Sequence, residues 1–171
     1  MRLAAPMISL LALASALAGC QALAPAPDLA TLPHATLAGT HVDVNGDRVD
    51  SFRVLEIDGR SVLPITDQPM KLIGHDATNL VAAGHGVRVD VEAFAAYNNT
   101  MRSMFWDPMR AHGIVEFVPA AGARYVVNGS VSPEVSSVWI ENAETHQVVG
   151  RTISVPGRAA SAADAASAPA Q

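Results

Sequence analysis

The stretch Val87-Arg88-Val89-Asp90-Val91-Glu92 decides the fold class of this chain. Its three valines alternate with three charged residues, and in an extended strand the valines would lie on one face and the charges on the other. A strand with this period has one buried side and one side in water, as in an antiparallel sheet. It therefore needs partner strands with the same period of two.

Six further segments with strand character surround this stretch, and each ends in turn residues. They are residues 52–57, 60–65, 113–118, 124–131, 135–141 and 147–155. Asp58-Gly59 joins the first two and is typical of a two-residue hairpin, and the turn Asn142-Ala143-Glu144-Thr145 joins the last two. About seven short strands predict an all-β fold, a single antiparallel β-sandwich.

The order of these pieces carries a wider resemblance. An Ile57-Asp58-Gly59 hairpin is followed by the turn Gly84-His85-Gly86, by the strand of Tyr125, and by Val138-Trp139-Ile140-Glu141. This order resembles the small PEGA-like or transthyretin-like β-sandwiches of envelope proteins. The chain departs from that pattern in lacking a proline before Gly84 and in having a long connection after Phe94. The resemblance implies a fold and an envelope setting, and little about a ligand.

The connection from Phe94 to Met109 is unusually rich in aromatic residues and methionines. A short helix capped by Asn99 or Thr100 and stopped at Asp107-Pro108 would place Met101 and Phe105 on a common face. One interpretation is that this face fills an open end of the sandwich. The other is an exposed binding surface with Arg102 and Arg110 at its edge; its residues would be Tyr97, Met101, Met104, Phe105, Trp106 and Met109.

The N-terminus has the features of a secretion signal. Arg2 precedes an apolar run that ends in Leu17-Ala18-Gly19-Cys20, and Cys20 is the only cysteine. These residues resemble a bacterial lipoprotein signal peptide with its lipobox. The resemblance implies that the Cys20 sulfur receives a diacylglyceryl group, that cleavage occurs before Cys20, and that the new amino group is acylated, typically with palmitate. An ordinary signal peptide cut after Ala14-Ser15-Ala16 is the alternative, although it would leave an unpaired thiol in an exported protein.

The same resemblance implies a location. Gln21 follows the cysteine, and lipoproteins retained at the inner membrane tend to carry aspartate there, so we expect the outer membrane of a Gram-negative envelope. Two or three acyl chains would hold the protein durably, whereas one chain would not. Whether the domain faces the periplasm or the cell exterior stays open.

The domain organisation follows from these boundaries. We expect a signal peptide at 1–19, the lipidated cysteine with a flexible proline-containing linker at 20–34, the sandwich domain at 35–158, and an Ala/Ser-rich disordered tail at 159–171. A frayed helix is the alternative for the tail. The formal net charge of −5 and the lack of a Lys or Arg cluster argue against a nucleic-acid partner.

The remaining polar residues form no catalytic or metal-binding pattern. His75, His85 and His112 match no paired-ligand spacing, and the stretch from Asp43 to Asp47 lacks the remaining ligands of a calcium loop. No Gly-x-Ser-x-Gly elbow is present. We therefore expect no catalytic residue, metal or cofactor, and no enzymatic activity.

Two functions remain on the sequence alone. The first is a non-enzymatic, lipid-anchored accessory module that binds another envelope protein. The alternative is a module that binds a glycan or cell-wall polymer, with Trp106, Tyr97 or Trp139 stacking on sugar rings.

Overall fold

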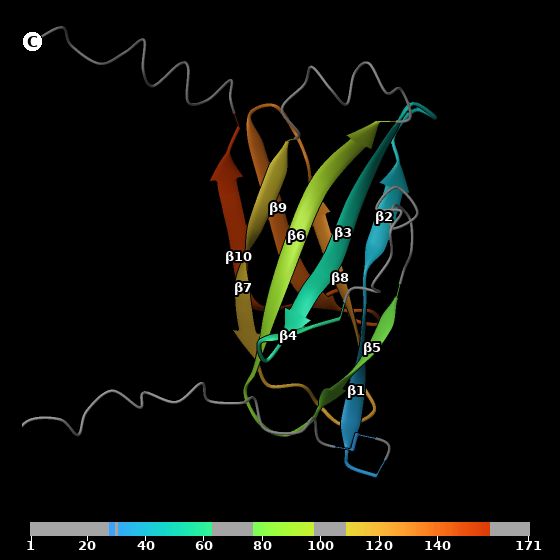
Figure 1. Cartoon of the computed structure of the whole chain (residues 1–171), viewed down its shortest axis with the longest axis vertical. Coiled ribbons are helices and arrows are strands. Elements are labelled where there is room, and N and C mark those ends of the chain that lie inside the picture. The colour runs from blue at the N-terminus through green and yellow to red at the C-terminus, as the bar shows by residue number, and fades with distance from the viewer. Residues whose placement is uncertain (1–27, 30, 63–76, 98–108, 158–171) are drawn as a thin grey trace, which may run out of the picture.

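A computed structural model describes residues 28–29, 31–62, 77–97 and 109–157, which form two sheets packed face to face (Figure 1). The predicted all-β sandwich is confirmed. In the described part of the chain the strands are β1 (His34–Ala38), β2 (Thr40–Asp43), β3 (Arg48–Ile57), β4 (Arg60–Ser61), β5 (Thr78–Ala82), β6 (Val87–Tyr97), β7 (Arg110–Phe117), β8 (Arg124–Ser130), β9 (Val135–Asn142) and β10 (Val148–Pro156).

Each sheet draws on both halves of the described chain. Sheet A has the order β10-β9-β8-β1-β5, and sheet B has the order β2-β3-β6-β7, with β4 paired to β3. The pairs are antiparallel except β1 with β8, which run parallel in the register Leu37↔Tyr125. The chain passes from sheet A to sheet B at Gly39, where a Cβ atom would lie 2.8 Å from the Phe52 carbonyl oxygen.

Three strands, β1, β2 and β5, were not predicted. β1 begins at His34, which the sequence analysis assigned to the linker. The predicted return strand 60–65 is a strand only at Arg60–Ser61, and residues 63–65 lie outside the described residues. The predicted linker up to residue 27 and the tail from 159 also lie outside them.

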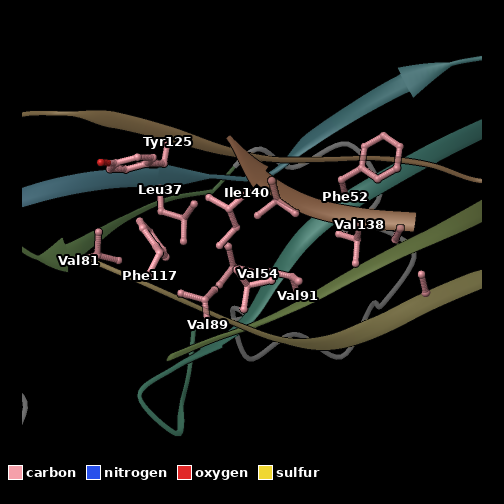
Figure 2. Close-up of a cluster of buried hydrophobic side chains, with 14 of the residues drawn as sticks. Leu37, Phe52, Val54, Val81, Val89, Val91, Phe117, Tyr125, Val138 and Ile140 are labelled. Carbon is pink, nitrogen blue, oxygen red and sulfur yellow. The ribbon is translucent and has the colours of Figure 1, made fainter. Parts of the chain in front are cut away.

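The core lies between the sheets, and Figure 2 shows its side chains meeting from both. Val87, Val89 and Val91 are each at most 1% exposed, which confirms that these valines share the buried face. The rings of Phe117 and Tyr125 meet edge to face with centroids 5.0 Å apart. The Tyr125 hydroxyl accepts a hydrogen bond from the Ala120 N–H at 3.1 Å, so its polar end is also satisfied.

Phe52 is the bulkiest fully buried side chain of the core, and it lies against a glycine. A Cβ atom at Gly129 would lie 2.7 Å from two carbons of the Phe52 ring and would also contact the Ser137 carbonyl oxygen. The ring therefore occupies the space that any side chain on this inward position of β8 would need.

The turns follow their residue types. Asp58 and Gly59 have φ values of 50° and 74°, as a two-residue hairpin with both central residues left-handed requires, and they join β3 to β4 as predicted. The Gly84 turn is different. It connects β5 in sheet A to β6 in sheet B, so it is a crossover between the sheets and not a hairpin. The Gly84 N–H donates to the Pro119 carbonyl.

Candidate functional site

Two residues of the predicted aromatic and methionine surface can be placed. Tyr97 ends β6 and Met109 directly precedes β7, and both are partly buried and pack against the core. Met101, Met104, Phe105 and Trp106 lie outside the described residues, as do Leu17, Ala18, Gly19 and Cys20 of the predicted lipobox.

The strands on either side of this segment are neighbours. β6 pairs with β7 in the register Phe94↔Arg110, and the Ala95 N–H donates to the Met109 carbonyl. The predicted connection therefore starts too early, because residues up to Tyr97 continue the strand and pair with β3. Likewise β7 begins at Arg110 and not at residue 113.

The outer face of sheet B carries a charged network centred on Glu92. Its carboxylate lies 2.7 Å from Arg53 Nη2 and 3.0 Å from Arg110 Nε, and the Arg53 guanidinium stacks on the Phe94 ring at 4.5 Å. Glu92 is only 5% exposed, so the prediction that this face of the strand is exposed to solvent is wrong at this position. Two arginines on neighbouring strands compensate the buried carboxylate, and this network is structural.

A second group of charges lies further along β6 and β7. His112 Nε2 is 2.7 Å from Asp90 Oδ1 without hydrogen-bond geometry, so this buried oxygen accepts no hydrogen bond from the described residues. Arg88 and Glu116 pair beside them. A shallow hollow of about 420 Å³ opens here, lined by Arg88, Ile114, Glu116 and Arg151. Arg88 is paired with Glu116, and Arg151 Nε donates to the Ile114 carbonyl, so the lining keeps one positive charge in excess.

The outer face of sheet A carries a hydrogen-bonded cluster around Glu141 on β9. Trp139 Nε1 donates to Glu141 Oε2 at 2.7 Å, and Asn128 Nδ2 on β8 donates to Oε1 at 3.3 Å. His146 Nδ1, from the turn before β10, lies 3.2 Å from the same Oε1. Glu141 is 7% exposed, whereas the His146 side chain is 77% exposed. The cluster joins a buried carboxylate to a ring that reaches water.

The ionisation of Glu141 reflects these contacts. Burial by itself would raise the pKa of this carboxyl group, because the charged form loses solvation. The hydrogen bonds from Trp139, His146 and Asn128 oppose that effect, and the net result is a pKa below the usual glutamate value. Glu141 is therefore a carboxylate at neutral pH, and it accepts hydrogen bonds from the indole and the amide.

Further polar groups border Trp139. The Ser137 and Ser154 hydroxyls lie 2.9 Å apart, on the neighbouring strands β9 and β10. Ser137, Trp139 and Glu141 alternate along β9 with the buried Val138 and Ile140, so all three lie on the outer face. The result is a half-buried aromatic ring with hydroxyl, amide, imidazole and carboxylate groups around it.

The described residues provide no metal centre. No three His, Cys, Asp or Glu side chains among them lie close enough to hold an ion. Nor does any helix in this part of the chain have the length and hydropathy needed to cross a membrane.

Sequence reasoning named Trp139 as a candidate for stacking but missed its partners. The period of two along β9 would have placed Glu141 on the face of Trp139. Asn128 reaches the cluster through the register of β8 with β9, and His146 reaches it from the turn after β9. In comparisons with known proteins, no protein-family model, curated protein sequence or solved structure significantly matches this chain.

Proposed function

We propose that this protein is a lipid-anchored, non-enzymatic module of the bacterial outer membrane, attached through Cys20. The observation that carries the proposal is the tetrapeptide Leu17-Ala18-Gly19-Cys20 behind a basic and apolar N-terminus, which resembles a complete lipobox. Lipidation also accounts for the lone cysteine of a protein that is exported. The resemblance of the sequence to PEGA-like or transthyretin-like sandwiches supports an envelope setting.

The sandwich is the part that binds, and another envelope protein is the first candidate partner. β2 lies at the edge of sheet B, and Val42 within it and Val44 just after it are 51% and 48% exposed. An edge strand with exposed apolar side chains is a surface onto which a partner strand can add. Binding at this edge requires no catalytic group.

The test of the anchor is Cys20→Ser. We expect the variant to remain an uncut precursor without incorporated palmitate, and to leave the outer-membrane fraction. Mass spectrometry of the wild-type mature protein should show a diacylated or triacylated Cys20 as its first residue. A Cys20→Ser protein that is processed and fractionates as the wild type would refute the anchor, and an N-terminus after Ala16 would favour the ordinary signal peptide.

The test of the partner is crosslinking in intact cells. A photo-reactive residue at Val42 should trap one defined envelope protein. Val118 is the matched control, because this valine is 63% exposed and directly follows β7. β2 and β7 form the two opposite edges of sheet B (Figure 1). Equal adducts from both positions, or none from Val42, would contradict a protein partner at this edge.

A glycan is the second candidate ligand. The observation that favours it is the half-buried Trp139 among hydrogen-bonding side chains on the outer face of sheet A.

A further inference from the structure

We infer that Trp139 and the polar residues around it form a binding site for a neutral saccharide, a pyranose unit of an envelope glycan. This inference rests on the proposed function only for the envelope location, and it names the class of ligand that the module binds there. The site itself stands on the geometry of sheet A. It comprises Asn128, Ser137, Trp139, Glu141, His146 and Ser154.

The indole ring of Trp139 has a fixed orientation. Trp139 Nε1 donates to Glu141 Oε2 at 2.7 Å, and Glu141 is itself held by Asn128 and His146. This charge-assisted hydrogen bond to a buried carboxylate holds the ring edge. The ring therefore loses little freedom when a ligand stacks on it, and pre-organisation of this kind reduces the cost of binding.

Hydrogen-bonding groups surround the ring. The Ser137 and Ser154 hydroxyls share one hydrogen bond, so one hydroxyl hydrogen is left to donate. Asn128 Nδ2 uses one hydrogen on Glu141 and keeps a second, and the His146 ring, bonded through Nδ1, keeps Nε2. A pyranose presents an apolar face of C–H groups and a rim of hydroxyls. The ring fits the face, and these groups fit the rim.

The charges of the site favour an uncharged ligand. The six residues contain no lysine or arginine, and their one carboxylate is already engaged by three donors. A phosphorylated or acidic polymer would find no lysine or arginine among these residues to pair with. A neutral sugar needs none, so the site favours uncharged pyranose units over anionic ones.

The experiment is a titration of the purified full-length protein in detergent. The probes are the β-1,4-linked tetramer of N-acetylglucosamine, cellotetraose and maltotetraose. Calorimetry and tryptophan fluorescence measure the binding of each probe. We expect saturable binding of at least one probe. Trp139→Ala should weaken it at least tenfold, and Trp139→Phe should weaken it less because an aromatic face remains. Leu80→Ala, on β5 at the far edge of sheet A, is the surface control and should bind as the wild type does.

Circular dichroism of each variant establishes that it is folded, and Ser137→Ala gives a second, milder variant, with a smaller loss expected. The inference is overturned if the folded wild type binds none of the three probes, or if Trp139→Ala binds as tightly as the wild type. Binding to a protein at Trp139 without saccharide binding would also overturn it. Loss of the anchor in Cys20→Ser would leave this result untouched, because the titration does not depend on membrane attachment.

Discussion

Gly129→Ala should be among the most damaging single-methyl changes in the described sandwich. The new Cβ atom would lie 2.7 Å from the Phe52 ring and against the Ser137 carbonyl of the neighbouring strand. Neither the Phe52 ring nor the Ser137 carbonyl can move away easily, because Phe52 is 2% exposed and Ser137 is hydrogen-bonded in the β8–β9 ladder. Overpacking of this kind costs about 1–3 kcal/mol, and contact with a backbone atom places the change in the upper part of that range, at about 2–3 kcal/mol.

Two other glycines give a graded comparison. At Gly113 a Cβ would lie 3.2 Å from atoms of the Ile153 side chain, which can adjust, so Gly113→Ala should change stability by less than about 1 kcal/mol. At Gly86 a Cβ would meet nothing within 4 Å. Gly86→Ala should therefore stabilise the protein by about 0.4–1 kcal/mol, by restricting the unfolded chain.

Urea unfolding, monitored by circular dichroism, measures the unfolding free energy of the three variants. The dependence of this free energy on urea concentration should be the same for all of them. The midpoint should fall in the order Gly86→Ala, wild type, Gly129→Ala, with Gly113→Ala close to the wild type. The double variant Gly129→Ala with Phe52→Leu should lose less than the sum of its parts, because the smaller side chain relieves one of the two contacts. If Gly129→Ala unfolds at the same urea concentration as Gly86→Ala, the proposed packing of Phe52 against β8 is wrong.

Three further predictions concern polar groups. Because the pKa of Glu141 is lowered in the folded state, its stabilisation should be complete above the unfolded-chain value of about 4.3 and should disappear as the pH falls through the folded pKa. The difference in unfolding free energy between wild type and Glu141→Gln, measured from pH 7 to pH 3, should shrink accordingly; a difference independent of pH would contradict this. Glu92→Gln should lower the free energy of unfolding by about 1–3 kcal/mol, because Arg53 and Arg110 lose a buried counter-charge. A change below about 0.5 kcal/mol in urea unfolding would show that the network contributes little. Tyr125→Phe should cost about 1 kcal/mol in thermal unfolding by removing the acceptor of the Ala120 N–H, and an unchanged midpoint would mean that water replaces the hydroxyl.

The sequence predicted the parts of the fold whose signals are local. The valines at 87, 89 and 91 are spaced for one face, and Asp58-Gly59 suits a left-handed two-residue turn. β1 and β5 carry no comparable signal, being five residues each with no charged alternation. Their strand conformation depends on ladders with residues distant in sequence, β1 being held between β8 and β5. Such pairings are tertiary and leave little trace in local composition.

The candidate site shows the same division. Trp139 was recognisable as an aromatic residue in a strand, and Glu141 follows it by two positions. The register Asn128↔Trp139 brings in the amide, and the turn after β9 brings in the imidazole. A register shift of one residue would point Asn128 to the opposite face, so composition alone could not have identified the cluster.

The parallel pairing of β1 with β8 has a consequence for the order of folding. Thr40, just after β1, donates to the Val127 carbonyl, a partner 87 residues further along the chain. The middle of sheet A therefore cannot form until most of the domain is available, and β1 must wait for a strand made late in synthesis. Long-range pairing of this type slows folding, so a sheet that closes late leaves the chain unfolded for longer while it is being made. That property would suit the export that we propose for this protein, because a chain passes through a translocation pore before it folds.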